Sequence, residues 1–260
     1  MNWFQGIALG LLQGITEILP ISSDGHLALL LQYWQLPEAT RLNLSAALHL
    51  GTALAILIFM FSKVKNTVRD LIAPNPEIRK EAWRLILMIV IGSIPVVTVG
   101  LLLENIVEKI FNRLTLVSLL FIINGTILLT TYFACPKKRR ITPAMAFLIG
   151  LVQASATLPA ISRSGTTISL ALLLGVSATD AFEFSFLIAL PVTIGAAIFE
   201  LLKIDFSVLA PGPVIAGIIV AGLSGYLMLI SLRRLVFRQQ LYWFGIYCWA
   251  LGLLTFIIFR

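Results

Sequence analysis

Six apolar stretches, each long enough to cross a bilayer, constrain this chain more than any other feature. They cover residues 44–62, 83–103, 113–133, 180–202, 211–231 and 240–259. A helix needs about 20 mainly apolar residues to cross the hydrocarbon core, so each stretch is predicted to be a transmembrane helix. The composition agrees, because 59% of the residues are hydrophobic and only 12% are charged. We therefore predict an all-α integral membrane protein.

Two further apolar regions, 2–35 and 143–176, are interrupted in the middle by proline, serine and glycine. Each half of such a region is too short to cross alone, because a spanning helix takes about 20 residues. We predict that each region forms a re-entrant hairpin, in which two short helices are joined by a break. Irregular backbone at membrane depth is tolerated only where protein or a wet cavity surrounds it, so both breaks are expected to be enclosed.

Basic residues set the expected orientation. Three loops, at 63–84, 136–140 and 232–239, hold most of the 19 lysine and arginine residues. With six spanning helices, all three loops lie on the same side of the membrane. By the positive-inside rule, that side is the cytoplasm. Both termini then lie outside, the first hairpin enters from outside, and the second enters from the cytoplasm. Since these loops explain the net charge of +7, no nucleic-acid partner is expected.

The two breaks carry variants of one polar motif at a constant offset in the sequence. The matched pairs are Gln13 with Gln153, Ser22 with Ser162, and Gly25 with Gly165. Three spans follow the first hairpin, so the second copy is inverted in the membrane. We predict an inverted-topology repeat within one membrane domain, 1–260, with halves at 1–135 and 141–260. Such folds place their sites near the bilayer midplane, where the repeats meet.

The first break is preceded by Gln13 and Glu17, which share one helix face. A carboxylate buried at membrane depth keeps its charge only beside a cation. A hard divalent ion with oxygen ligands would suit Glu17, with Gln13 as a neighbouring ligand. The alternative is a neutral Glu17 that is hydrogen-bonded within its own hairpin.

The residues Ser22, Ser23, Asp24 and His26 start the returning half-helix of the first hairpin. One of the first three is expected to be the N-cap, and Asp24 is assigned to capping or to solvent rather than to catalysis. His26 follows Ser23 by about one helical turn, so the two side chains are predicted to meet. His26 could then be a general base, a nucleophile or a ligand, and a structural histidine is the alternative.

The second break holds Arg163 among hydroxyl side chains. Arginine cannot lose its charge, and it binds phosphate oxygens bidentately. An anion, such as a phosphate group, is therefore expected beside Arg163, with Ser162, Ser164 and Thr167 as further ligands. An ion pair with Glu17, which needs no ligand, is the alternative. We expect Glu17 and His26 to face Arg163 across one shared hollow.

Two polar residues within the predicted spans are given structural roles. His49 lies near the start of the span 44–62 and could line the same cavity, but a structural role at the helix end is preferred. Asn124 interrupts the span 113–133 and is assigned to helix packing.

Four motifs in order resemble the undecaprenyl-diphosphate phosphatase family, the bacitracin-resistance type of integral membrane phosphatase. The resemblance covers nearly the whole chain. The motifs are Gln13-Gly-Ile-Thr-Glu17, Pro20-Ile-Ser-Ser-Asp-Gly-His26, Pro159-Ala-Ile-Ser-Arg-Ser-Gly-Thr-Thr167 and Phe184-Ser-Phe-Leu-Ile-Ala-Leu-Pro191. Two departures stand out. Ala160 replaces the usual glycine, which suggests a less tight turn, and Gln13 replaces a common acid, which would weaken charge neutralisation of a metal.

The resemblance implies hydrolysis of undecaprenyl diphosphate to undecaprenyl phosphate and inorganic phosphate, which recycles the cell-wall lipid carrier. It implies a Mg²⁺- or Ca²⁺-dependent site that opens to the outer face of the bacterial inner membrane, and it leaves open whether the chain forms a homodimer. The implied roles are catalytic for Glu17, Ser23, His26 and Arg163, phosphate-binding for Ser22, Ser162, Arg163, Ser164 and Thr167, and metal-binding for Glu17 and Gln13. Two nucleophiles remain: Ser23 activated by His26, which is preferred, or His26 itself.

A secondary transporter or flippase for an anionic or lipid-phosphate substrate is the competing interpretation. Inverted repeats with broken helices are the usual architecture of secondary transporters, and Arg163 with half-helix amides could bind an anion and pass it across. A nucleophile pair of Ser23 and His26 beside a carboxylate favours an enzyme, because binding alone needs no nucleophile.

Overall fold

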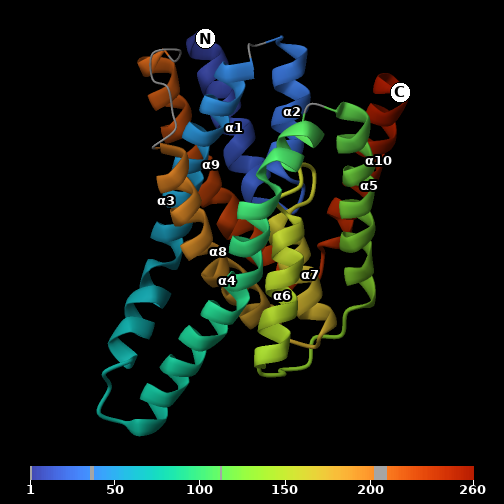
Figure 1. Ribbon diagram of the computed structural model, residues 1–260. Coiled ribbons are helices and arrows are strands. Elements are labelled where there is room, and N and C mark those ends of the chain that lie inside the picture. The colour runs from blue at the N-terminus through green and yellow to red at the C-terminus, as the bar shows by residue number, and fades with distance from the viewer. Residues whose placement is uncertain (1, 36–37, 112, 202–209) are drawn as a thin grey trace.

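The computed structural model describes residues 2–35, 38–111, 113–201 and 210–260, and these fold almost wholly into helices (Figure 1). The helices are α1 (Trp3–Ile18), α2 (Ser23–Tyr33), α3 (Glu38–Asp70), α4 (Pro76–Phe111), α5 (Leu114–Leu129), the 3-10 helix η1 (Thr130–Phe133), α6 (Pro143–Ser155), α7 (Arg163–Leu173), α8 (Ala178–Leu201), α9 (Pro211–Phe237) and α10 (Tyr242–Phe259). Within the described ranges there is no β-strand, only one isolated bridge between Arg139 and Val176. The all-α prediction is confirmed.

Six helices are long and apolar enough to cross a membrane, as the sequence predicts. Their spanning parts are Asn43–Asp70, Pro76–Gly100, Leu114–Phe133, Ala178–Ala196, Pro211–Phe237 and Tyr242–Phe259. The helices α3 and α4 continue past the predicted ends into charged sequence, because hydropathy marks only their apolar part. Residue 202, the last of the predicted span 180–202, lies outside the described residues. The chain is a multi-pass membrane protein.

The outer faces of the bundle are apolar. Leu223 of α9 is 66% exposed and Ile257 of α10 is 76% exposed, and many other large apolar side chains are similarly uncovered. A soluble protein rarely leaves so much contiguous apolar surface in water. These faces are therefore suited to contact with lipid tails.

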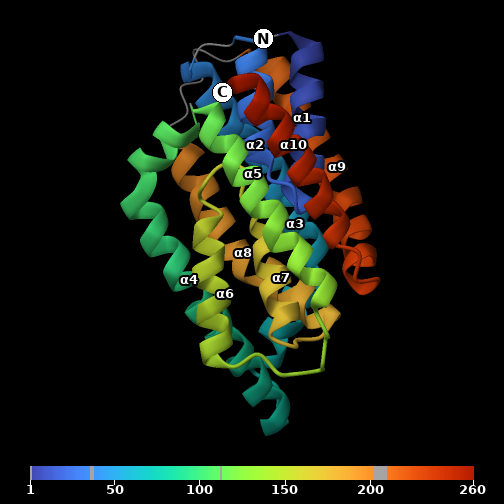
Figure 2. The same cartoon turned by 90° about the vertical axis from the view of Figure 1, so that its right-hand side faces the viewer.

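Two helical hairpins, α1 with α2 and α6 with α7, end in breaks inside the bundle. In Figures 1 and 2, α1 and α2 extend inward from the end that holds both termini, whereas α6 and α7 extend inward from the opposite end. Each break contains one non-glycine residue in the left-handed region, Ser22 with φ +66° and Ala160 with φ +68°. The looser turn expected at Ala160 is not seen, because the alanine adopts a φ that glycine reaches without strain.

Glycines let each hairpin approach a long span closely. A Cβ at Gly10 of α1 would collide with the backbone of Gly217 in α9, and a Cβ at Gly150 of α6 would collide with the backbone of Gly92 in α4. Small residues at helix contacts are typical of membrane proteins, where close packing drives association. The first hairpin thus rests on α9 and the second on α4.

Two buried apolar clusters enclose the breaks. The larger one joins α3, α6, α7, α8 and α9 around Phe182 and Phe186. A smaller one packs Phe121 of α5 and Cys248 of α10 against Ile21 and Ala160, which belong to the two breaks. The polar residues of both breaks are therefore surrounded by protein.

Candidate active site

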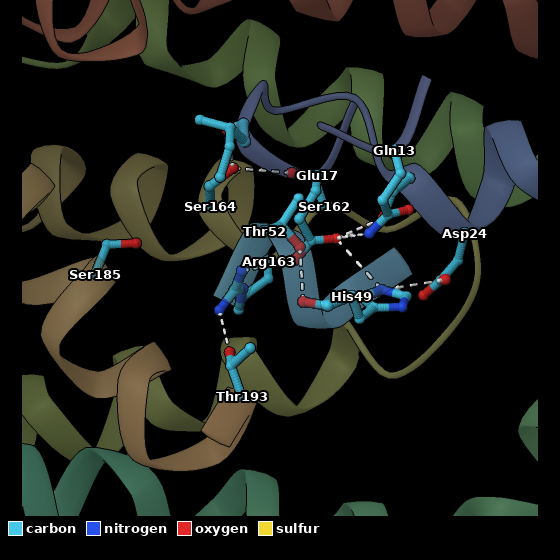
Figure 3. A network of polar contacts seen from close by, with 12 residues as sticks. Gln13, Glu17, Asp24, His49, Thr52, Ser162, Arg163, Ser164, Ser185 and Thr193 are labelled. Atoms are coloured by element: carbon cyan, nitrogen blue, oxygen red, sulfur yellow. Dashed lines mark hydrogen bonds and ion pairs between the residues drawn. The ribbon is translucent and has the colours of Figure 1, made fainter. Parts of the chain in front are cut away.

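Glu17, in the last turn of α1, is the centre of the polar network drawn in Figure 3. Its Oε1 accepts a 2.7 Å bond from Arg163 Nη2, and its Oε2 accepts a 2.5 Å bond from Ser23 Oγ. The side chains of Glu17 and Arg163 are only 13% and 16% exposed. The ion pair that the sequence left as an alternative is therefore formed, and it joins the two breaks.

Local sequence places Ser23 beside Glu17. Leu19 is extended because it precedes proline, so α1 ends there, and the left-handed Ser22 turns the chain into α2. Ser22 is the N-cap residue of α2, which agrees with the expectation that Ser22, Ser23 or Asp24 would take this position, but its side chain makes no cap hydrogen bond. Without a cap, the N-terminal amides of α2 can receive an anion.

Arg163 begins α7 and divides its guanidinium between two helices. Nη2 binds Glu17 of α1, and Nη1 donates a 2.7 Å bond to Thr193 Oγ1 of α8. Thr193 carries no sequence signal that would have identified it. Because its two terminal nitrogens have separate acceptors, the guanidinium is held at the junction of both hairpins.

The hydroxyls around Arg163 have partners within the protein. Ser162 Oγ accepts a bond from Gly165 N and so caps α7. Ser164 Oγ donates to the carbonyl of Ile18 at 3.0 Å, and Thr167 Oγ1 donates to the carbonyl of Arg163 at 2.7 Å. All three hydroxyl side chains are buried. A phosphate contact from Ser162, Ser164 or Thr167 stays a prediction.

The predicted pair of Ser23 and His26 does not form. His26 Nδ1 lies 2.7 Å from the carbonyl of Ser22, and Nε2 lies 2.7 Å from Tyr247 Oη of α10. The ring packs edge-on against Phe121. His26 therefore points away from Ser23 and Glu17, and its contacts fix the strained backbone at Ser22. Of the two side chains expected to face Arg163, only Glu17 does so.

Gln13 offers one oxygen that could serve as a neighbouring metal ligand. Its side chain is buried, Nε2 lies 3.5 Å from Glu17 Oε2, and Oε1 has no hydrogen-bond partner among the described residues. An unsatisfied buried oxygen beside a carboxylate suits Mg²⁺ or Ca²⁺. The described residues hold no cluster of three His, Cys, Asp or Glu side chains, so substrate oxygens and water would complete the shell.

His49 was assigned a helix-end role from the sequence, and the structure corrects this. The helix α3 begins at Glu38, so His49 lies well inside it. Its Nε2 is 3.5 Å from Glu17 Oε2 and 3.8 Å from Asp24 Oδ1 (Figure 3). His49 therefore belongs to the site. Asp24 is 37% exposed, which agrees with its assignment to solvent.

Asn124 of α5 connects the two breaks. Its Nδ2 donates a 3.1 Å bond to the carbonyl of Pro20, and its Oδ1 accepts a 3.0 Å bond from the amide of Ser162. The sequence assigned this residue to helix packing. A polar side chain in the middle of an apolar span was the signal for this contact.

Comparison with known proteins identifies the family. Residues 6–254 match the family model described as bacitracin resistance protein BacA. The chain is 35% identical to the undecaprenyl-diphosphatase of Desulforapulum autotrophicum, over 99% of this chain and 98% of that protein. It is also 35% identical to that of Syntrophotalea carbinolica and 33% identical to that of Thermotoga petrophila, each over at least 97% of both chains. The chain therefore belongs to the bacitracin resistance protein BacA family.

Proposed function

We propose that this chain is a membrane phosphatase that hydrolyses undecaprenyl diphosphate to undecaprenyl phosphate and inorganic phosphate. Relatives named undecaprenyl-diphosphatase match it over nearly their whole length. One observation carries the chemistry: Ser23 Oγ lies 2.5 Å from Glu17 Oε2, while Arg163 holds the other oxygen of the same carboxylate. A nucleophile, a proton acceptor and an anion-binding cation are thus in contact.

The first half-reaction transfers the terminal phosphate to Ser23. Ser23 Oγ attacks the terminal phosphorus in line with the bridging oxygen, and the hydroxyl proton passes to Glu17. The bond between that phosphorus and the bridging oxygen breaks, and undecaprenyl phosphate leaves with the electron pair. Glu17 replaces His26 as the base because the hydroxyl already donates to its carboxylate.

The second half-reaction releases inorganic phosphate. Water attacks the phosphorus of phosphoserine, the bond from phosphorus to Ser23 Oγ breaks, and Glu17 returns its proton to Oγ. A proton of the attacking water passes to solvent. Atoms and charge balance, and the enzyme regains its starting state.

Two features of the chain stabilise the charge that develops on the phosphate oxygens. Arg163 supplies a fixed positive charge in a water-poor setting, where electrostatic stabilisation is strong. Ser23 is the first residue of α2, so a phosphorus on its Oγ lies beside the uncapped helix N-terminus, which favours anions.

A divalent cation would be held by Glu17 and by Oε1 of Gln13. Bound Mg²⁺ or Ca²⁺ would supply further charge neutralisation on the diphosphate. Because Gln13 is neutral, Glu17 would be the only charged ligand in this pair. The metal is therefore expected to bind tightly only together with the anionic substrate.

We place both hairpins as re-entrant elements of an inverted repeat within a single membrane domain, with halves at 1–135 and 141–260. Reciprocal contacts support this: Gly25 faces Ala160, and the matching Gly165 faces Pro20. The hairpin helix α1 packs on α9, the second span of the other half, and α6 packs on α4 in the same way. Contacts that exchange between halves are those that a two-fold axis produces.

The protein would lie in the bacterial inner membrane with both termini outside and the basic loops in the cytoplasm. The N- and C-termini lie at the same end of the bundle, from which α1 and α2 extend inward (Figure 1). The site would open toward that side. This orientation rests on the positive-inside rule.

The polyprenyl tail would leave the site sideways between α4 and α8. A groove of about 360 Å³ lies there, and its lining includes Val90, Ile94 and Val97 of α4 and Pro191 of α8. Pro191 is close in sequence to Thr193, which binds Arg163. An apolar groove lined by a residue two positions before Thr193 suits the hydrocarbon tail of a substrate whose diphosphate head binds at Arg163.

Release of phosphate from undecaprenyl diphosphate by the purified protein in detergent with Mg²⁺ tests the function. Wild type should release phosphate, and Ser23→Ala and Arg163→Ala should abolish turnover. A Ser23→Ala variant with wild-type turnover would contradict Ser23 as the nucleophile. No release by wild type, together with transfer of lipid phosphate across vesicles, would instead support a transporter.

A further inference from the structure

We propose that His49 is a positioning residue that keeps the Glu17 carboxylate divided between Ser23 and Arg163. This inference rests on the proposed function, since it concerns the orientation of the base. His49 comes from α3, a span outside both hairpins. No motif that carries the resemblance includes it.

The helix α3 fixes the orientation of the His49 ring. Nδ1 lies 2.8 Å from the carbonyl oxygen of Ser45, one turn earlier in the same helix. A carbonyl only accepts hydrogen bonds, so Nδ1 carries a proton, and an Nε2 that holds a carboxylate must carry a proton as well. The opposite edge, Nε2, is thereby directed at Glu17 and Asp24 (Figure 3).

The position of His49 Nε2 opposes the usual bidentate binding of a carboxylate by arginine. A guanidinium prefers to bind both oxygens of a carboxylate through two parallel bonds. Here only Nη2 of Arg163 reaches Glu17, because Thr193 takes Nη1. His49 lies beside Oε2, the oxygen that Arg163 leaves for Ser23. Without His49, the carboxylate could rotate into the guanidinium fork and leave the serine.

His49 also contacts both helices of the first hairpin. Glu17 belongs to α1 and Asp24 to α2, so one ring on α3 lies against both sides of the break. The base and the nucleophile lie on these same two sides. The distances of 3.5 Å and 3.8 Å are long for hydrogen bonds, but contacts of catalytic groups often tighten only when substrate binds.

Three substitutions of His49 separate orientation from packing. His49→Leu keeps the volume and removes the polar edge, His49→Gln places an amide N–H near the position of Nε2, and His49→Asn is too short to do so. We expect kcat to fall roughly 10- to 100-fold in the leucine and asparagine variants, since small misplacements of catalytic groups have effects of this size. The glutamine variant should recover to within about threefold of wild type, and KM should change little in all three.

Two further measurements make the test specific. Thr52→Val, on the same helix, removes a hydroxyl whose hydrogen bond goes to the backbone carbonyl of His49, and it should retain wild-type kcat. In a Glu17→Gln background, His49→Leu should cause no further loss, because residues that act through one another are not additive. Melting temperatures in detergent identify any variant that has lost its fold, and the glutamine–asparagine comparison then carries the test.

The outcomes are distinct. Any of three results would overturn the positioning role. These are a wild-type kcat in His49→Leu, equal losses of kcat in the glutamine and asparagine variants, and an undiminished loss when His49→Leu is made in the Glu17→Gln background. In these cases phosphate release by wild type would leave the proposed function intact. No release by wild type would overturn the proposed function and this inference together.

Discussion

The two hairpins share one backbone plan but differ at their breaks. In the first, the left-handed residue Ser22 directly precedes α2, whose N-terminus has no side-chain cap. In the second, the left-handed residue is Ala160, and Ser162 then caps α7. The N-terminal amides of α2 can therefore bind an anion, whereas at α7 the side chain of Ser162 already accepts from an N-terminal amide.

The groups proposed to act in catalysis also differ between the two hairpins. At the constant sequence offset between the two polar motifs, Glu17 matches Thr157 and Ser23 matches Arg163. The first hairpin holds the proposed base and nucleophile, and the second holds the cation and the hydroxyls that brace it. Two hairpins of similar backbone thus carry different groups, because a hydrolytic reaction needs different groups on the two sides of the phosphorus.

The largest expected difference between the hairpins is in catalysis. Glu17→Gln should lower phosphate release by roughly 10²- to 10⁴-fold, the contribution of a general base, while the amide oxygen still accepts from Arg163. Thr157→Val is the matched control, because Thr157 donates to the nearby carbonyl of Ala154, and it should stay near wild type. Similar losses at both positions would show that the chemistry is shared between the hairpins.

The next difference concerns the glycines where the breaks touch. A Cβ at Gly25 would lie 2.5 Å from Phe121 Cζ and 2.9 Å from the backbone of Ala160, whereas a Cβ at Gly165 would have 3.1 Å to its nearest neighbours. Gly25→Ala should destabilise the protein by about 1–3 kcal/mol, as overpacking does. Gly165→Ala should cost less, because small shifts relieve it. Denaturation in mixed micelles measures both, and the reverse order would contradict the asymmetry of this contact.

The side-chain caps at the two breaks should differ in their contribution to stability, and this effect is smaller. Ser162→Ala removes the bond to Gly165 N and should cost about 1 kcal/mol of stability, a usual value for an N-cap. Ser22→Ala removes no cap bond and should leave stability nearly unchanged. The same denaturation assay compares the two, and equal losses would mean that Ser22 also caps its helix.

The smallest effect is expected at the strained turn of the second hairpin. Ala160→Gly relieves a left-handed alanine, which costs about 1–2 kcal/mol, but adds chain entropy to the unfolded state, so a net gain of roughly 0.5 kcal/mol remains. A higher melting temperature in detergent with unchanged turnover is the expected result. A loss of stability would mean that the alanine methyl group contributes more packing than its φ costs.

Most of the fold could be predicted from the sequence, because the bilayer sets the length and the apolar character of every helix that crosses it. The six spans follow from apolar stretches such as 211–231, and the hairpins follow from Pro20 and Pro159 inside regions too short to cross twice. The ends of α3 and α4 could not be predicted in this way, because their charged final turns extend beyond the apolar sequence. Hydropathy detects the membrane-facing part of a helix and not the whole helix.

The site was predicted less completely, because contacts between distant helices leave no local pattern. Glu17, Ser23 and Arg163, which were singled out from the sequence, are in contact between the two breaks. His26 was paired with Ser23 because one turn separates them, but Tyr247 of α10 draws its ring away. His49 and Thr193 reach the site through the packing of α3 and α8, which spacing within a single helix does not reveal.

The close seam between α1 and α9 has a consequence for biosynthesis. Gly6 lies against Pro213 and Gly10 against Gly217, so α1 meets its permanent neighbour α9 only after the helices between them have been synthesised. Until then the glycine face of α1 lacks the helix that covers it. A nascent chain would therefore need temporary shelter at the insertion machinery, and its final compaction would be a late, concerted event.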